Sequence, residues 1–275
     1  MREFIDFAKS YGLIMQSLEL HKWVRVATVG HPKKRNGAYK FIGTAGWVRD
    51  HATMTEPVMW KPGAKAAEID MPEIRRMQAD AAAELSRKRF TASERAQHIL
   101  DGCYKGTHPY LLRKGFPTEQ WNVCHKGEQK ILCIPMWVGS DLVGMQMINE
   151  AGDKKFLSGQ RTKLAVFPLG SGGRTILCEG FATGLSIRAA LATIPGRHWI
   201  AVCFSAGNLL EVAKTRPGAL VVADNDVSGT GQRVANDSKL PYWLSETEGH
   251  DFNDDMQALG VFQVSQSLRS ALSQK

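Results

Sequence analysis

Short apolar strands alternate with helical segments in the C-terminal part of the sequence, and this pattern constrains the fold more than any other feature. In chain order, the expected elements are strands at 174–178, 199–204, 219–223 and 241–244 and intervening helices at 181–192, 208–214 and 231–239. Alternation of this kind is typical of a parallel sheet covered by helices. We therefore predict an α/β domain at 174–260, followed by a C-terminal helix at 261–275.

The residues before this domain show different patterns. The segment 107–173 contains a strand–turn–strand–turn–strand pattern at 130–168, which predicts an antiparallel meander. Residues 64–106 are rich in Ala, Arg, Glu and Met and predict a helical segment or linker. Within them, Thr91 begins a T-x-x-E sequence, which predicts a capping box at the start of a second helix.

The first 63 residues are predicted to form a small basic module of mixed α+β structure. A helical pattern begins the chain, and Gly12 interrupts it. An alternating, β-branched run at 23–29 predicts a strand. A turn signal follows, and 39–42 predicts the returning strand.

Acidic residues follow two of the C-terminal strands at the point where each strand ends. Glu179 comes directly after the strand at 174–178, and Asp224 and Asp226 come after the strand at 219–223. Because ligands of open parallel sheets bind at the carboxyl ends of the strands, we expect the three carboxylates to converge. Their mutual repulsion favours a hard divalent cation, Mg²⁺ or Mn²⁺. A lone Asp-Asn-Asp is also typical of a surface turn, but its pairing with Glu179 favours the metal site.

Neighbouring residues extend this candidate site. Gly180 and Gly229 are expected to keep the turns after the acids tight and to let a backbone or a phosphate approach. Asp251 and Asp254 form a further acidic cluster after the last predicted strand. This cluster either completes a second metal position or caps the start of a helix.

The sequence around these acids resembles the Toprim domain shared by bacterial-type DNA primases, topoisomerases and some nucleases. That signature is a strand ending in Glu-Gly and a later strand ending in Asp-x-Asp, found here as ILC-Glu179-Gly180 and LVVA-Asp224-Asn225-Asp226. The sequence is more closely similar to Toprim primases of phages and conjugative plasmids. The similar segments are HPYLLRKG (108–115), KKFLSG (154–159), CEGFATGLSI (178–187), FSAGNL (204–209), VVADND-x-SGTGQR (221–233) and HDFND (250–254).

The resemblance implies a DNA primase, a nucleotidyltransferase that makes short RNA primers from NTPs on a single-stranded DNA template. It implies that Glu179 acts in the chemistry at the primer hydroxyl and that Asp224 and Asp226 hold metal ions, with a two-metal site expected. It also implies a basic groove beside the acids that binds nucleotide and template. The candidate residues for that groove, which also fit a solvated face, are Lys154, Lys155, Arg161 and Lys163.

The chain departs from bacterial-type primases in two respects. Its five cysteines are scattered without a CxxC pair, so no zinc ribbon and no zinc are expected, and all five are interpreted as reduced thiols. No GxxxxGK[ST] motif is present, so any replicative helicase is expected to be a separate partner. The alternatives are a Toprim nuclease and a non-catalytic DNA-binding accessory protein. The meander counts against the first, and the intact acids count against the second.

Basic and aromatic residues are interleaved near the N-terminus. The stretch from His21 to Trp47 contains no acidic residue. Lysine and arginine bind phosphates, and aromatic side chains stack on bases, which together suit single-stranded DNA. The alternative is a basic hairpin whose aromatic residues form a core. The residues predicted to bind DNA are Lys22, Arg25, Lys33, Lys34, Arg35 and Lys40.

The charge of the chain is unevenly distributed. Residues 1–173 hold 26 basic and 17 acidic side chains, whereas the remainder holds 9 and 10. A basic front half indicates a polyanionic partner. No apolar run approaches the roughly 20 residues that cross a bilayer, and the N-terminus lacks the apolar core of a signal peptide. We therefore expect no membrane association and a cytoplasmic location.

Overall fold

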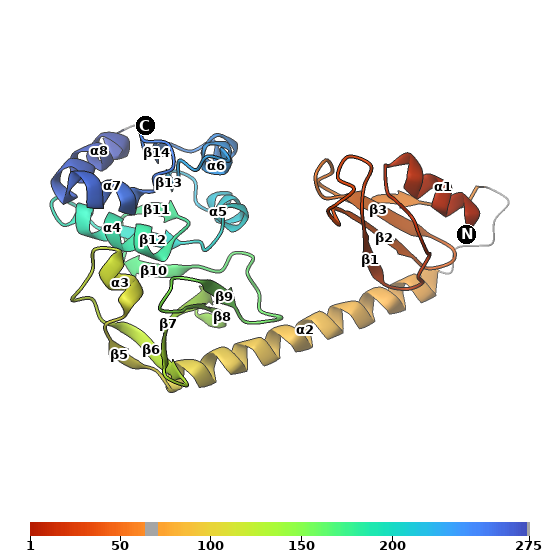
Figure 1. The fold of residues 1–275 in the computed structure, drawn as a ribbon, viewed down its shortest axis with the longest axis horizontal. Helices are drawn as coiled ribbons and strands as arrows, with labels where there is room; N and C mark the ends of the chain where they lie inside the picture. Colours follow the sequence, from red (N-terminus) through yellow and green to blue (C-terminus); the bar gives the residue numbers. More distant parts are fainter. Residues whose placement is uncertain (64–70, 274–275) are drawn as a thin grey trace. The chain divides into compact units, whose positions relative to one another are not determined.

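The computed structural model describes residues 1–63 and 71–273 and divides into two compact units (Figure 1). The N-terminal unit is Met1–Ala82, and the C-terminal unit is Ala83–Lys275. Residues 64–70 of the predicted helical segment and 274–275 of the predicted C-terminal helix lie outside the described residues.

The N-terminal unit contains a four-stranded antiparallel sheet with one helix packed on it. Its elements are α1 (Arg2–Ser10), β1 (Trp23–Val26), β2 (Gly37–Phe41), β3 (Gly46–Asp50) and β4 (Val58–Trp60), with the strands in that order in the sheet. Phe4 of α1 stacks on Phe41 of β2 with ring centroids 4.6 Å apart, and Gly46 leaves room for the Phe4 ring. Sequence patterns predicted β1 and β2, but β1 is shorter than expected because the chain turns at Thr28. They did not predict β3 and β4.

One continuous helix, α2 (Met71–Asp101), stands where two helices were predicted. The capping box predicted at Thr91 is wrong. The helix continues through this position because neither Gly nor Pro occurs between residues 73 and 101. The Ser93 hydroxyl donates instead to the carbonyl of Leu142 at 2.6 Å, and Ala96 of the same helix is buried against the meander. Residues that resembled a cap therefore take part in packing within the C-terminal unit.

The C-terminal unit contains a five-stranded antiparallel meander, whose last three strands correspond to the predicted pattern. Its strands are β5 (Tyr104–Gly106), β6 (Trp121–Lys126), β7 (Gln129–Val138), β8 (Asp141–Ile148) and β9 (Lys154–Phe156). The short helix α3 (Pro109–Arg113) connects β5 to β6, and the side chain of His108 caps it. The meander extends further towards the N-terminus than the pattern at 130–168 indicated, since β5 and β6 precede that pattern.

A second five-stranded sheet follows, and it is parallel except for one edge strand. Its strand order is β10 (Phe167–Gly170), β12 (His198–Val202), β11 (Arg174–Cys178), β13 (Leu220–Ala223) and β14 (Tyr242–Leu244). Only β10 runs antiparallel to its neighbour. β10 was not predicted, because its four residues include a proline and a glycine, and Pro168 is tolerated there as part of an edge strand. The α/β class predicted for this region is confirmed.

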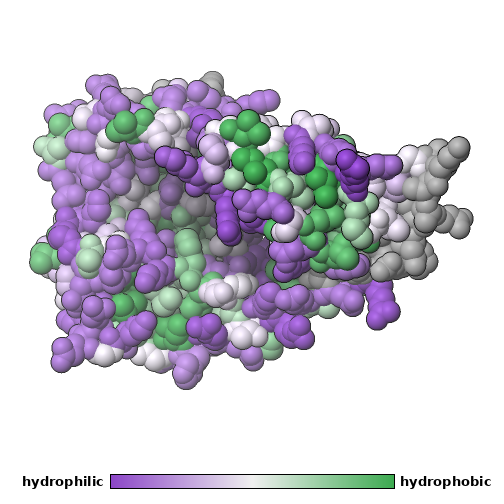
Figure 2. Space-filling model, turned by 45° about the vertical axis from the view of Figure 1, so that its right-hand side comes forward, coloured by the Kyte–Doolittle hydropathy of each residue, from purple (hydrophilic) through white to green (hydrophobic). Residues whose placement is uncertain are grey.

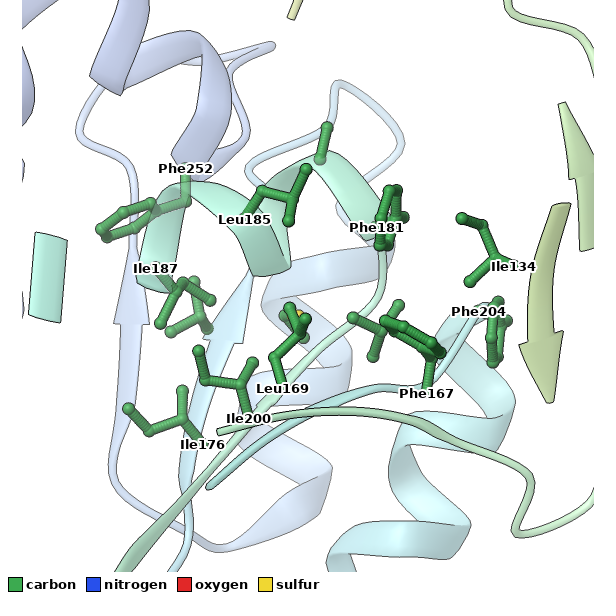
Figure 3. Close-up of a cluster of buried hydrophobic side chains, with 14 of the residues drawn as sticks. Ile134, Phe167, Leu169, Ile176, Phe181, Leu185, Ile187, Ile200, Phe204 and Phe252 are labelled. Atoms are coloured by element: carbon green, nitrogen blue, oxygen red, sulfur yellow. The ribbon is translucent and has the colours of Figure 1, made fainter. Parts of the chain in front are cut away.

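Helices cover both faces of this sheet. One face is covered by α4 (Phe181–Leu191), α7 (Phe252–Leu259) and α8 (Val261–Ser273), whereas α5 (Ala206–Ala213) and α6 (Thr230–Ser238) cover the other. The larger core lies on the α4 face (Figure 3), where Phe181 and Leu185 pack against Ile176 and Ile200 of the sheet. Ile134 of the meander joins the same core, so the two sheets of this unit share one interior.

No helix among residues 1–63 and 71–273 is long and apolar enough to cross a membrane. Hydrophilic residues dominate the face drawn in Figure 2, and hydrophobic residues gather there in separate patches.

Candidate functional site

The predicted acids lie at the carboxyl ends of two adjacent parallel strands. β11 ends at Cys178, directly before Glu179, and β13 ends at Ala223, directly before Asp224. The two strands pair in parallel, with Cys178 opposite Val222. The sheet register therefore places Glu179 and Asp224 at the same edge, as predicted from the alternation of strands and helices.

The loop that carries the aspartates is fixed through Asn225. The backbone N–H of Asn225 donates to the carbonyl of His250 at 2.9 Å, and its side-chain amide donates to the carbonyl of Ser245 at 3.0 Å. These bonds tie the loop after β13 to the loop after β14. The residue between the two aspartates thus holds in place the loop that presents Asp224.

The carboxyl group of Asp224 is buried, and one of its oxygen atoms lacks a hydrogen-bond partner. That atom is Oδ1, which is enclosed by the protein. Burial, followed by the nearby carboxylates of Asp251 and Glu179, raises the pKa of Asp224 to about 7, although Lys154 opposes this rise. A buried carboxylate without a partner is costly, and a bound cation relieves that cost.

Glu179 is also largely buried, but more nearby groups stabilise its charged form. Burial raises its pKa, and Asp226 acts in the same direction. Lys154 and the backbone N–H of Ala206 lower it. The backbone carbonyl of Glu179 accepts from the N–H of Phe204 at 2.9 Å, which fixes the turn after β11. A carboxylate with a raised pKa is a stronger proton acceptor than an ordinary glutamate.

Asp226 differs from Asp224, and here the predicted geometry needs correction. Its Oδ2 accepts from the backbone N–H of Gly231 at 2.9 Å, and its Oδ1 accepts from the backbone N–H and the hydroxyl of Ser228. These hydrogen bonds lower the pKa of Asp226. Because its carboxylate caps the start of α6, the three acids do not meet within 4.8 Å of one another as a group.

The two glycines after the aspartates have distinct roles. Gly229 adopts a left-handed conformation, with φ of 66°, at the start of α6. Gly231 is required for a different reason, since a Cβ atom there would lie 1.8 Å from the backbone oxygen of Asp224. α6 therefore packs directly against the loop that presents Asp224. At the other strand end, Gly180 begins α4.

Asp251 and Asp254 form a capping box at the start of α7. The Asp254 N–H donates to Asp251 Oδ1 at 2.9 Å, and the Asp251 N–H donates to Asp254 Oδ2 at 3.2 Å. Asp251 also lies close enough to Asp224 to raise its pKa. Asp254 is paired with Lys114, whose Nζ lies 3.3 Å from its Oδ1. The capping role considered from sequence is present, and it leaves Asp251 facing the buried carboxylate.

A pocket of about 510 Å³ borders these acids and carries basic side chains. Its lining includes Lys154, Gly180 and both aspartates of the capping box. Lining residues that were not predicted include Tyr110, Arg113, Lys114, Thr183 and Gln257. The first three belong to the segment HPYLLRKG. Burial and the charge of Asp251 raise the pKa of Tyr110 to about 12. The pocket thus combines positive charge with the open N-terminal end of α4.

Only one of the four predicted groove lysines and arginines contacts this site. Lys154 lines the pocket and lowers the pKa of both Glu179 and Asp224. Lys155 lines a separate small pocket. Lys163 pairs with Glu211 at 2.8 Å, and Arg161 donates to the carbonyl of Lys163. Adjacent strand residues point to opposite faces, which explains why Lys154 and Lys155 separate.

In the N-terminal unit, strand pairing sorts the predicted DNA-binding segment into a core face and an outer face. Tyr39 and Phe41 belong to the core. Trp23, Lys40 and Trp47 form a row of directly paired positions across three strands on the other face, and Trp23 is 48% exposed. Arg25 is exposed two residues along from Trp23. Lys33, Lys34 and Arg35 are exposed in the turn between β1 and β2, and Lys22 pairs with Glu19.

The buried acids fit a hard divalent metal ion. Asp224 offers an enclosed oxygen without a partner, and the carboxylates of Glu179 and Asp251 lie near enough to raise its pKa. Oxygen donors of this kind are the ligands that Mg²⁺ and Mn²⁺ prefer.

Comparison with known families agrees with this arrangement. Residues 174–261 match the family model of the Toprim domain. This part of the chain is a Toprim domain. It includes β11 to β14 and α4 to α7, and the match confirms the resemblance seen in the sequence around the acids. Glu179 and the two aspartates after β13 therefore lie at the strand ends of the Toprim sheet.

One solved structure to which part of the chain is similar is the crystal structure of a DNA primase domain from Pseudomonas aeruginosa, with a TM-score of 0.35 and 14% sequence identity. The aligned part covers 60% of this chain and 58% of that chain, which is less than two thirds of its length. No curated protein matches this chain.

Proposed function

We propose that this protein is a DNA primase, of the type found in phages and conjugative plasmids, that makes short RNA primers on single-stranded DNA. The observation that carries the proposal is a buried, partly uncompensated acidic set at the strand ends of a Toprim sheet, next to a basic pocket. Acids and bases placed side by side in this way suit a reaction between an anionic substrate and a metal-assisted hydroxyl group.

The proposed reaction joins a primer 3′-hydroxyl to the α-phosphate of an NTP. A new oxygen–phosphorus bond forms, the bond to the β-phosphate breaks, and pyrophosphate leaves. Glu179 accepts the hydroxyl proton, a role that its raised pKa favours. Mg²⁺ or Mn²⁺, held by Asp224 and Asp226 with Asp251 or Asp254 at a second position, would supply activation of the hydroxyl and neutralise the phosphates.

The pocket is the proposed site for the triphosphate. Arg113, Lys114 and Lys154 line it and provide positive charge. Gly180 begins α4 without a side-chain cap, so the first N–H groups of an 11-residue helix are free to bind a phosphate. Lys154 lies near both Glu179 and Asp224, and therefore links the pocket to the acids.

The N-terminal unit is the proposed template-binding module. Its outer face combines Trp23 and Trp47 with Lys40, and the exposed basic residues Lys33, Lys34 and Arg35 lie in the turn that connects β1 to β2. Aromatic stacking and phosphate contacts of this type bind single strands without strict sequence preference. A replicative helicase would act as a separate partner.

The test is a primer-synthesis assay on single-stranded DNA with labelled NTPs and Mg²⁺ or Mn²⁺. Short RNA products are expected from the unmodified chain and should be absent from the Glu179→Gln and Asp224→Asn variants. The exposed residues Glu128 and Asp237 provide matched controls as Glu128→Gln and Asp237→Asn, which should retain synthesis. Metal-dependent degradation of DNA without RNA products would instead establish the nuclease alternative. DNA binding without either activity would establish an accessory protein.

A further inference from the structure

Three of the five cysteines lie together on one face of the antiparallel meander. Cys103 immediately precedes β5, Cys124 lies in β6, and Cys133 lies in β7. Their sulfur atoms all lie within 4.8 Å of one another, and those of Cys124 and Cys133 are 3.5 Å apart. In the part of the chain that the structure describes, no other three potential metal-ligating side chains meet this closely.

The strand register explains why these cysteines meet. Tyr104 pairs with Val123, so the preceding Cys103 lies beside Cys124. Cys124 pairs with Ile131, and Cys133 follows two positions along β7, on the same face and diagonally opposite. None of these neighbours is close in sequence, so the absence of a CxxC pair did not exclude a cysteine cluster.

The surroundings of the cluster are apolar. Ala96, Leu142 and Met145 are buried around it, and Cys133 itself is fully buried. Three sulfur atoms that lie within 4.8 Å of one another among apolar side chains suit a soft metal ion, which displaces the thiol protons when it binds.

We propose that Cys103, Cys124 and Cys133 bind a thiophilic metal ion, Zn²⁺ or Cu⁺. Soft thiolate ligands select these ions. A tetrahedral zinc site with Zn–S bonds of about 2.3 Å places its sulfur atoms about 3.8 Å apart. The 3.5 Å between Cys124 and Cys133 is close to this spacing, so a small rotation of side chains completes the site.

The neighbouring residues limit the identity of a fourth ligand. Met147 pairs directly with Cys133 and is half-buried beside the cluster. A pocket of about 120 Å³ lined by Ile131 and Met147 lies on this side of the sheet. His125 points to the opposite face, where its ring stacks on Tyr104 and its Nε2 bonds the Tyr104 hydroxyl at 3.1 Å. The fourth position is therefore a thioether or an external ligand.

The proposed site has a structural role. Cys103 lies two residues after the end of α2 at Asp101, so the ion connects the end of this helix to β6 and to β7. Metal binding of this kind contributes directly to folding stability. The site lies outside the Toprim domain, and the proposal does not depend on the proposed primase function.

The test is a titration of the full, chelator-treated chain with Co²⁺ under anaerobic conditions. Cobalt substitutes for zinc, and thiolate ligands give it an intense charge-transfer absorption in the near ultraviolet that carboxylates do not give. We expect the band to saturate at one equivalent, to persist in Asp224→Asn, and to disappear on addition of Zn²⁺. It should be lost in Cys103→Ala and Cys124→Ala and retained in Cys203→Ala, a buried thiol outside the cluster.

Competition experiments then identify the ion. Displacement of Co²⁺ by Zn²⁺ with retention of zinc against a chelator would identify zinc, and retention of Cu⁺ against a copper-specific chelator would identify copper. Either result supports the site. Absence of the band from the folded, reduced wild-type chain would overturn the proposal, as would a band that survives in Cys124→Ala. A Cys124–Cys133 disulfide without metal binding would also overturn it.

Folding of the variants is checked by circular dichroism. If the alanine variants do not fold, the wild-type chain still decides the question through its reactivity with an alkylating agent, read by mass spectrometry. Added Zn²⁺ or Cu⁺ should protect Cys103, Cys124 and Cys133 and leave the alkylation of Cys178 and Cys203 unchanged. Equal alkylation of Cys103 and Cys124 with and without these metals would contradict the proposal.

Discussion

The strand-end acids of the C-terminal unit and the outer sheet face of the N-terminal unit both carry residues of the proposed sites, but in opposite environments. Asp224 is enclosed, has an oxygen without a partner and has its pKa raised to about 7. Trp23, Arg25 and the Lys33–Arg35 turn are exposed to water. The first arrangement costs stability and needs a ligand to relieve that cost, whereas the second costs nothing in the free protein. Changes to the two regions should therefore differ in size and in kind.

The largest effect is expected from Glu179→Gln. Removing a group that accepts a proton in the reaction typically lowers the rate by about 10²–10⁴-fold, while a neutral amide of the same size leaves the fold intact. We expect primer synthesis to fall by this factor with DNA affinity unchanged. The measurement is single-turnover primer extension, with Glu128→Gln as the control. A reduction of less than about tenfold would remove Glu179 from the reaction.

Asp224→Asn should lower activity and raise stability. The folded pKa of Asp224 is about 7 against an ordinary value of 3.8, so the fold favours its neutral form. That stabilisation is complete below about pH 3.8 and is lost as the pH rises to about 7. Without metal at pH 8, the variant should therefore be more stable than the wild type by roughly 2–4 kcal/mol.

Urea denaturation at pH 5 and pH 8 in the presence of a chelator measures this difference. The advantage of the variant should shrink at pH 5 and should also shrink when Mg²⁺ is added at pH 8, because a cation compensates the wild-type carboxylate. Equal stabilities of the two proteins at pH 8 without metal would mean that the carboxylate of Asp224 is hydrated. The strand-end acids would then not differ from the outer sheet face in their exposure to water.

Gly231→Ala tests how rigidly the acid loop is held. A Cβ atom would lie 1.8 Å from the backbone oxygen of Asp224, so α6 or the loop must move, at a cost of about 2–3 kcal/mol. Gly229→Ala is the matched control, since it meets no atom within 4 Å and has only its left-handed backbone to accommodate, at about 1 kcal/mol. Urea midpoints of both variants measure the difference. Equal costs would show that the loop is pliable.

The strand-end acids were predictable because the information lies within single segments. One buried strand is followed at once by Glu179, and another by Asp224 and Asp226. Recognising these two patterns requires no knowledge of strand register. The turning of Asp226 towards α6 could not be predicted, because it depends on how the first turn of that helix sits on the loop. The same limit applies to the pocket, whose lining joins α3, the β8–β9 loop, α4 and α7.

Residues that are neighbours across paired strands could not be predicted from the sequence, for a related reason. Cys103, Cys124 and Cys133 meet only through the register of three strands, and so do Trp23, Lys40 and Trp47. Neither register could be derived from alternation alone, because β3 was not recognised and the start of β5 was not placed. Composition indicated that the N-terminal segment is basic and aromatic. The fold decided which of its aromatic residues are available to a ligand.

The smallest effect is expected from Trp23→Ala, which tests the exposed outer face of the N-terminal unit. Trp23 is 48% exposed and pairs across the sheet with Lys40, so its removal should leave stability nearly unchanged. Removal of one stacked base lowers affinity for single-stranded DNA by about 1 kcal/mol, or about fivefold. Fluorescence anisotropy with a labelled oligonucleotide measures this, and Phe262→Ala, at an exposed aromatic residue of α8, is the control.

Salt dependence separates stacking from charge on the same face. Trp23→Ala should leave the slope of affinity against salt concentration unchanged, whereas charge reversal of Lys33, Lys34 and Arg35 should reduce it by about 0.7 for each phosphate that the turn no longer neutralises. Unchanged DNA affinity at low salt after that reversal would exclude this turn from template binding. The outer face would then have to bind DNA through its tryptophans alone, or the template would be held entirely by the C-terminal unit.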